Sequence, residues 1–181
     1  MEKIRKKANL KSNTADPAEN DINCFDCDKV PCHYSEGCDA CVDSLVTFVP
    51  KNCMACKSCE LACALGHSAS GDINESISEY PRPVSRLKIV YGDGKLHLIR
   101  CLHCKRPKCV EVCQSGALTK NCDGVVTIND ERCTGCFECV DACPFGAIQI
   151  RGREAVKCDL CGDAGELSCV LACKCGALVY E

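Results

Sequence analysis

The residues that could do chemistry in this sequence are its cysteines, which number 23 among 181 residues. The densest run, Cys53-x2-Cys56-x2-Cys59-x3-Cys63, places four thiols within eleven residues. Four thiols this close together cannot each form a separate disulfide bond, whereas they can converge on one inorganic core. Zinc and iron–sulfur clusters both prefer thiolate ligands, so the spacing predicts metal binding.

Sixteen cysteines fall into four groups of this kind, motifs 1 to 4 in chain order. The motifs are Cys53, Cys56, Cys59 and Cys63; Cys101, Cys104, Cys109 and Cys113; Cys133, Cys136, Cys139 and Cys143; and Cys158, Cys161, Cys169 and Cys173. Motif 3 is followed by Pro144 and has the complete C-x2-C-x2-C-x3-C-P run of bacterial [4Fe–4S] proteins. Motifs 2 and 4 have a longer gap before the third cysteine, which lengthens one loop but keeps the CxxC start and the CxxxC end.

The N-terminus has no feature of an export signal, because the charged residues 1–7 are followed by a polar stretch instead of an apolar one. No run approaches the roughly 18 consecutive apolar residues of a transmembrane helix. We therefore expect a cytoplasmic protein with no membrane span, in a reducing compartment where disulfide bonds are rare. The odd number of cysteines also argues against a framework made only of disulfides.

The remaining composition indicates what must stabilise the fold. Hydrophobic residues make up 46% of the chain, but this figure includes the cysteines, and there is no Trp and only two Met. Such a chain cannot bury the apolar area expected for its length. We expect metal binding to supply most of the folding free energy, so the apo chain should be largely unfolded. A net charge of -3 gives no reason to expect nucleic acid as a partner.

A thirty-residue repeat shows which elements must position the motifs. A glycine follows the last cysteine of motifs 2, 3 and 4 at the same distance: Gly116, Gly146 and Gly176. We expect each glycine to let a short helix pass into a strand, at 147–150 and 177–180 for the last two. Further strands are expected at 125–128 and in a hairpin that joins 87–90 to 96–99. Each unit is therefore loop, short helix and strand.

The sixteen cysteines resemble, in order and spacing, the polyferredoxin electron-transfer subunits that carry four [4Fe–4S] clusters. Residues 52–68, around motif 1, are most similar to the carbon monoxide dehydrogenase iron–sulfur subunit and the small subunit of tungsten aldehyde oxidoreductases. The resemblance covers residues 44–181. It implies a loop-rich α+β fold of two bacterial-ferredoxin-like halves, each holding two clusters, with one half inserted in the other. The outer half would comprise 44–100 and 151–181, and the inserted half 101–150.

The same resemblance implies how the ligands are shared, because in the family motif 1 pairs with motif 4 and motif 2 with motif 3. One cluster would take Cys53, Cys56, Cys59 and Cys173, and its mate Cys158, Cys161, Cys169 and Cys63. The other half would use Cys101, Cys104, Cys109 and Cys143 for one cluster, and Cys133, Cys136, Cys139 and Cys113 for the other.

Five further cysteines precede the four motifs: Cys24, Cys27, Cys32, Cys38 and Cys41. They form a small Cys-rich extension, 22–43, behind a basic tail, 1–21, that we expect to be disordered. The first three repeat the spacing that begins motif 2, which favours a fifth [4Fe–4S] cluster with Cys38 or Cys41 as the fourth ligand. The two CxxC pairs fit a tetrahedral zinc or rubredoxin-type iron site as well, and both alternatives stay open.

Several residues outside the motifs allow two interpretations. His67 and His103 could donate hydrogen bonds to a cluster, or could be ordinary surface or packing residues. Cys175 is an alternative ligand to Cys173, whereas the isolated Cys122 fits a small buried apolar residue. A group of basic residues could dock an acidic redox partner or form a solvated loop: Arg100, Lys105, Arg106 and Lys108.

These features together predict an electron-transfer subunit in which four or five clusters relay single electrons, without catalytic residues of its own. The chain has no dinucleotide-binding, phosphate-binding or nucleophile motif. The expected partners are a catalytic redox subunit and a second carrier, namely ferredoxin, a pyridine-nucleotide oxidoreductase or a hydrogenase. A nickel carbon monoxide dehydrogenase is favoured as the catalytic partner over a tungsten or molybdenum aldehyde oxidoreductase or formate dehydrogenase. A structural zinc protein is the remote alternative.

Overall fold

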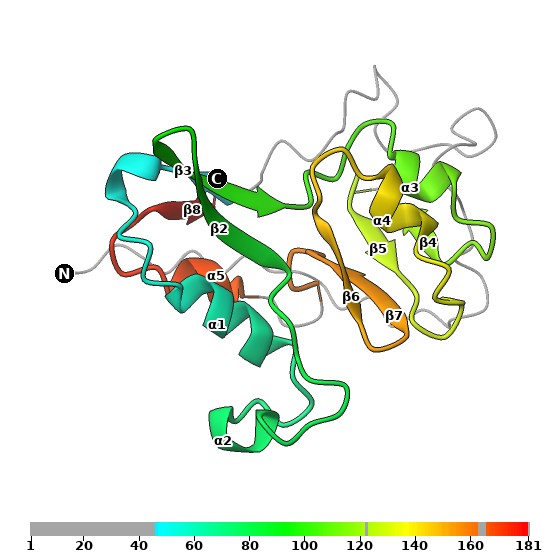
Figure 1. Ribbon diagram of the computed structural model, residues 1–181, viewed down its shortest axis with the longest axis horizontal. Coiled ribbons are helices and arrows are strands. Elements are labelled where there is room, and N and C mark those ends of the chain that lie inside the picture. The colour runs from blue at the N-terminus through cyan, green and yellow to red at the C-terminus, as the bar shows by residue number, and fades with distance from the viewer. Residues whose placement is uncertain (1–45, 122, 163–165, 181) are drawn as a thin grey trace.

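The computed structural model describes residues 46–121, 123–162 and 166–180. The predictions for the N-terminal tail, for the five cysteines between Cys24 and Cys41 and for Cys122 lie outside the described residues. The described chain consists of short helices and four two-stranded antiparallel sheets, a ferredoxin-like α+β architecture (Figure 1). No helix in these ranges is long and apolar enough to traverse a membrane.

The elements are short throughout. The strands are β1 (Val46–Phe48), β2 (Leu87–Gly92), β3 (Lys95–Arg100), β4 (Leu118–Lys120), β5 (Val126–Ile128), β6 (Ile148–Arg151), β7 (Glu154–Lys157) and β8 (Leu178–Tyr180). The helices are α1 (Ser58–Gly66), α2 (Ile73–Ser76), α3 (Lys108–Glu111), α4 (Glu138–Ala142) and α5 (Ser168–Leu171), with one 3-10 turn, η2 (Pro50–Asn52).

Two groups of elements, each with its own apolar core, make up the described chain. In the first group β1 pairs with β8, β2 pairs with β3, and α1 packs against α5. In the second group β4 pairs with β5, β6 pairs with β7, and α3 packs against α4. Figure 1 shows the two groups side by side, with the β6–β7 hairpin of the second group on the side that faces the first. The first group therefore combines segments from both ends of the described chain.

The two cores consist of strand residues together with motif cysteines. The first contains Val46, Cys59, Cys63, Leu87, Ile89, Cys169 and Leu178. The second contains Leu118, Val126, Cys139, Ile148 and Ala155. The β6–β7 hairpin crosses residue 150, and Ala155 packs in the second core, so this core extends beyond the boundary expected from the sequence.

The expected hairpin is confirmed and is longer than the sequence pattern indicated. β2 and β3 pair in register from Leu87 opposite Arg100 to Gly92 opposite Lys95. The two-residue turn between them, Asp93-Gly94, has φ values of 50° and 76°. Both residues are left-handed, which is the geometry that matches the twist of a tight hairpin.

The repeated unit is confirmed for motifs 2, 3 and 4. The N–H groups of Gly116, Gly146 and Gly176 each donate to the carbonyl of the last motif cysteine, at 3.1 to 3.2 Å. These glycines have φ values of 64°, 57° and 65°, and β4, β6 and β8 follow them. Motif 1 differs, because α1 has nine residues and continues past Cys63.

The first core gives a stability prediction. Leu87 is 2% exposed and packs in that core, so Leu87→Ala should lower the free energy of unfolding by about 2–5 kcal/mol. Lys88, the next residue, is exposed, and Lys88→Ala should change it by less than about 0.5 kcal/mol. Anaerobic denaturant unfolding of the metal-loaded protein measures both values. Equal effects of the two substitutions would contradict the assigned core.

Candidate metal-binding sites

We name the four predicted ligand groups sites A to D. Site A is Cys53, Cys56, Cys59 and Cys173; site B is Cys158, Cys161, Cys169 and Cys63; site C is Cys101, Cys104, Cys109 and Cys143; site D is Cys133, Cys136, Cys139 and Cys113. All sixteen residues lie in the described ranges as free thiols. Which atoms bind metal stays a prediction, and the geometry below is what the structure adds to it.

The four cysteines of site A line one cavity. Its volume is about 310 Å³, including space open to solvent, and its walls include Phe48, Ile89 and Leu178. Motif 1 and Cys173, which are distant in sequence, meet here because β1 pairs with β8 and α1 packs against α5. Cys175 lines the same cavity, with its Sγ 3.7 Å from that of Cys173. Both candidate fourth ligands are therefore within reach of site A.

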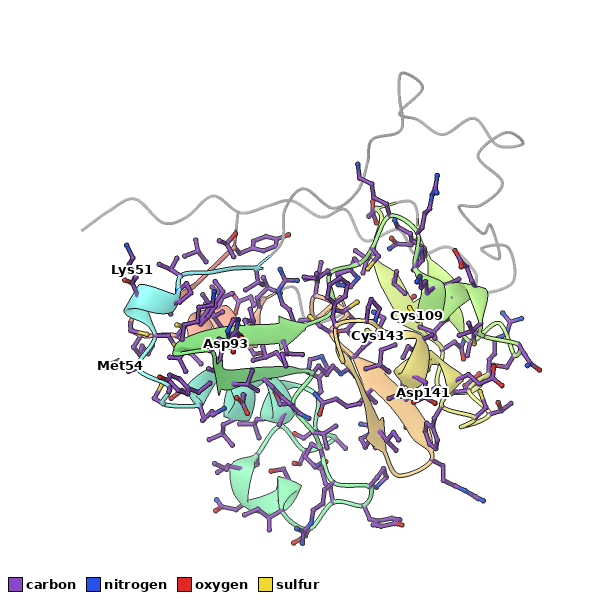
Figure 2. The ribbon with its side chains drawn as sticks, turned by 45° about the horizontal axis from the view of Figure 1, so that its top comes forward. Lys51, Met54, Asp93, Cys109, Asp141 and Cys143 are labelled. Atoms are coloured by element: carbon purple, nitrogen blue, oxygen red, sulfur yellow. The ribbon has the colours of Figure 1, made fainter. Side chains whose placement is uncertain are left out.

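The cysteines of the other three sites interact electrostatically within their own groups. Cys169 is affected by Cys63, Cys158 and Cys161, Cys109 by Cys101 and Cys143, and Cys139 by Cys113, Cys133 and Cys136. Figure 2 shows Cys109 and Cys143 close to each other, although 34 positions separate them in the sequence. The packing of α3 against α4 brings motifs 2 and 3 together.

One backbone feature recurs in all four motifs. The residue just before the second cysteine is left-handed in each: Ala55 (φ 55°), His103 (φ 47°), Gly135 (φ 71°) and Leu160 (φ 60°). Only one of them is a glycine, and residues with a Cβ rarely adopt this conformation because it strains the backbone. The same strained turn in four separate loops indicates that the four loops wrap around the same kind of object.

The strained turns direct N–H groups at sulfur atoms. Ala55 and His103 donate their N–H groups to the Sγ atoms of Cys53 and Cys101, each at 3.4 Å. The last cysteine of motif 4 also accepts a hydrogen bond, because the N–H of Leu178 donates to the Sγ of Cys173 at 3.3 Å. Hydrogen bonds from N–H groups to sulfur orient metal ligands and tune the metal centre that they bind.

The third cysteine of every motif has a strongly raised pKa, and burial is the largest cause. Burial raises the pKa of Cys59, Cys109 and Cys139 to about 11, and the pKa of Cys169 to about 12. Neighbouring motif thiols act in the same direction in each case. A buried thiol whose pKa is raised this far binds metal as a thiolate only when a positive ion compensates its charge. The donor set and its burial therefore fit a bound metal core.

Site B is surrounded by a charged network that the sequence did not reveal. His67 Nε2 lies 3.2 Å from the carboxylate of Asp159, and Arg86 forms an ion pair with the same carboxylate. Hydrogen bonds to Asp159, Cys161 and Cys63 raise the pKa of His67 to about 12. Burial alone would raise the pKa of Cys63, but hydrogen bonds from His67 and from the Arg86 N–H lower it. The network favours a thiolate at Cys63.

His103, within motif 2, is buried, and its Nδ1 accepts a hydrogen bond from the Val126 N–H at 3.0 Å. Burial and the nearby cations Lys157 and Arg100 lower the pKa of His103 to about 3, so the ring is neutral. Nε2 therefore carries the proton, and within the described ranges it has no acceptor. Such an orphaned buried donor fits a site whose acceptor is a bound group.

Comparison with known proteins indicates which class of metal group this family binds. Residues 96–181 match a family described as the 4Fe-4S dicluster domain. The electron transport protein HydN of Escherichia coli strain K12 is 32% identical over 145 residues, covering 70% of this chain and 81% of HydN. This chain belongs to the family of 4Fe–4S dicluster electron-transport proteins. It is an iron–sulfur protein, and the buried thiol groups fit [4Fe–4S] clusters.

Two other relatives are iron–sulfur proteins by name. An "Iron-sulfur protein" of Rhodospirillum rubrum is 39% identical over 126 residues, covering 63% of this chain and 66% of that protein. The iron-sulfur subunit of the nitrate-inducible formate dehydrogenase of Escherichia coli K12 is 32% identical over 148 residues, covering 71% of this chain. This chain spans slightly less than two thirds of the first relative and half of the second.

The basic group near motif 2 does not form one surface. Lys105, Arg106 and Lys108 are exposed, but Arg100 is buried and donates to the carbonyls of Val46 and Cys101. The interpretation of Arg100 as part of a docking surface or solvated loop is therefore wrong. Arg100 ends β3 directly before Cys101, where the chain passes from the first group of elements to the second.

The left-handed turn in motif 3 gives a testable substitution. A Cβ at Gly135 would lie 2.4 Å from the carbonyl oxygen of Arg153, and φ there is +71°. Gly135→Ala should therefore disrupt site D and remove about four iron atoms per chain. Ala55 holds the equivalent position in motif 1, and Ala55→Gly should keep the full iron content, since glycine relieves strain there. Equal iron contents in the two purified variants would contradict this reading of the loops.

The raised pKa values predict how metal binding depends on pH. Each thiol whose pKa lies near 11 or 12 must lose a proton when iron binds, so affinity should rise with pH. Each such thiol contributes up to about tenfold per pH unit below its pKa. Anaerobic competition with an iron chelator at pH 7 and pH 8.5 measures this through the visible absorbance of the clusters. Equal retention at both pH values would contradict it.

Proposed function

We propose that this chain is a non-catalytic electron-transfer subunit in which four [4Fe–4S] clusters, bound at sites A to D, relay single electrons. The observation that carries the proposal is the fourfold recurrence of one loop geometry, with four thiols gathered at each loop. Sites A and B fall within the first group of elements, and sites C and D within the second. The bis-ferredoxin arrangement with one half inserted accounts for this division.

The proposed sites follow one another along the molecule in the order A, B, C, D. Figure 2 shows Met54, in the motif 1 loop, at one end, and Asp141, in the motif 3 helix, towards the other. Cys56 of site A and Cys136 of site D are exposed, whereas every other site has its second cysteine at least partly covered. Electrons would enter and leave at the two exposed ends.

[4Fe–4S] clusters at these sites would accept and release one electron at a time. The chain's own residues would hold the thiols in place, direct N–H groups at sulfur and bury the third cysteine of motifs 1, 3 and 4. Fixed spacing and controlled hydrogen bonding are what a protein contributes to cofactor redox chemistry. The motifs leave no site with a missing thiolate that would bind a substrate.

The catalytic partner is a further proposal. The relative named as a formate dehydrogenase iron-sulfur subunit supports a molybdenum or tungsten enzyme. The carbon monoxide dehydrogenase partner expected from motif 1 rests on the resemblance of residues 52–68 alone. The second carrier would be ferredoxin, a pyridine-nucleotide oxidoreductase or a hydrogenase. A fifth metal site at the N-terminal cysteines remains part of the proposal.

Anaerobic purification of the native complex through a tag on this chain tests the function. We expect a brown protein with about sixteen iron atoms per chain, or about twenty with a fifth cluster. Nickel in the complex would identify a carbon monoxide dehydrogenase or a hydrogenase as partner, and molybdenum or tungsten a formate dehydrogenase or aldehyde oxidoreductase. The isolated chain should be reduced reversibly by one electron per cluster. A colourless zinc protein without reducible iron would refute the proposal.

Shared ligands give a prediction for single cysteine variants. Cys173 is the last cysteine of motif 4, whose other three cysteines belong to site B, but Cys173 itself would bind at site A. Cys173→Ser should therefore disturb sites A and B together. We expect a loss of up to about eight of sixteen iron atoms. Cys175→Ser is the matched control and should retain all of them. Iron analysis of the two purified variants decides which cysteine is the fourth ligand of site A. Loss of iron in Cys175→Ser alone would show that Cys175 is the ligand.

A further inference from the structure

Two fully buried cations lie where the two groups of elements meet. Lys157 is 2% exposed and Arg100 is 6% exposed. Each directly precedes the first cysteine of a motif, Lys157 before motif 4 and Arg100 before motif 2. Lysine and arginine are almost never this buried unless a partner compensates their charge.

Each side chain binds the backbone carbonyl of one distant strand and that of the motif cysteine that directly follows it in the sequence. Lys157 donates to the carbonyl of Val126 in β5 and, at 2.9 Å, to the carbonyl of Cys158. Arg100 donates to the carbonyl of Val46 in β1 at 2.6 Å and to that of Cys101 at 2.8 Å. These contacts fix both cationic groups between motif 2 and motif 4.

Each cation acts on thiols of two different sites. Burial lowers the pKa of Arg100, while Cys158 and Cys169 of site B and Cys101 of site C oppose that effect. Burial raises the pKa of Cys158 in site B and of Cys109 in site C, and the positive charge of Lys157 opposes this effect at both thiols. The two cations are therefore shared by sites B and C.

Carbonyl oxygens are the hydrogen-bond acceptors of these cations, and they carry no full charge. The ion pairs found in the described ranges involve other residues, and none includes Arg100 or Lys157. An uncompensated buried charge is strongly unfavourable. The negative charge that compensates it must come from the thiolates of sites B and C and the cores they hold.

We propose that Arg100 and Lys157 form a cationic bridge between sites B and C that raises the reduction potentials of both and links the two halves of the relay. The inference rests on the proposed electron-transfer function. Reduction of either site by one electron adds one negative charge near the bridge, and a buried cation stabilises that charge.

The bridge also favours transfer between the two sites. When one electron moves from site B to site C, site B is oxidised and site C is reduced by one unit, and no proton is required. The total negative charge facing the bridge is the same before and after this transfer. The catalytic subunit of the proposed complex supplies the electron, and the second carrier removes it.

Potentiometric titration of the anaerobic, cluster-loaded chain, followed by electron paramagnetic resonance, tests the bridge. Lys157→Met and Arg100→Gln should each shift two of the four midpoint potentials to more negative values, and the same two in both variants. The charge-retaining Lys157→Arg and Arg100→Lys should leave all four close to their original values. Unchanged potentials, a shift of one potential only, or an equal shift of all four would overturn the bridge.

Two controls separate charge from sequence position. Arg132 precedes the first cysteine of motif 3, as Arg100 does in motif 2, but Arg132 is exposed. Arg132→Gln and Lys95→Met, at the exposed start of β3, should not reproduce the paired shift, because water screens exposed charges. If either control shifts the same two potentials, buried charge is not the cause.

Iron content keeps the outcomes distinct. If neutral variants fail to assemble while the charge-retaining variants bind all their iron, the buried charge is required and the bridge is supported. If the charge-retaining variants fail as well, the two residues are structural and the bridge is overturned. A wild-type chain without four reducible clusters would overturn the proposed function itself, whereas unshifted potentials in fully loaded variants would overturn only the bridge.

Discussion

The structure depends on one constraint, which is that the thiol groups of each site must become thiolates although most of them are partly or fully removed from water. Burial raises the pKa of the third cysteine in every motif, and nearby thiols raise it further. Only a positive core reverses this balance, so the family's iron–sulfur clusters are as much a part of the core as its apolar side chains. Cys59, Cys63 and Cys169 belong to the same buried cluster as Leu87 and Val46.

This constraint explains why the remaining elements can be so short. Two-stranded sheets and helices of four or five residues are not stable by themselves in water. Here α3, α4 and α5 each begin at the residue directly before a third motif cysteine, and each ends one or two residues before the fourth. A core bound to both cysteines would hold each helix at its two ends. The β-strands that follow then close the apolar side of each site.

Local spacing predicted most of the fold, since a motif, its helix and the strand after the glycine are close in sequence. The sequence could not reveal which residues adopt strained turns: Ala55, His103 and Leu160 are left-handed like Gly135, yet only the glycine is a recognisable signal. The sequence was equally unable to reveal which charged side chains are buried. Arg100 and Arg132 hold the same position before a motif, but one is buried by the packing of distant segments and the other is exposed. Such differences arise from tertiary contacts, which no local pattern encodes.

The contacts between the two groups of elements bear on how a relay would work. Gln149 in β6 donates to the carbonyl of Ser85 at 2.6 Å, and Lys157 reaches Val126, so the β6–β7 hairpin is hydrogen-bonded on both sides. Electron transfer between cofactors requires a fixed separation, because the protein sets spacing as well as potential. The junction consists of buried hydrogen bonds and charge, and among the described cysteines Cys56 and Cys136, at the two ends of the proposed path, are the exposed ones. This arrangement would keep the middle of the path dry and favour exchange with partners at those ends.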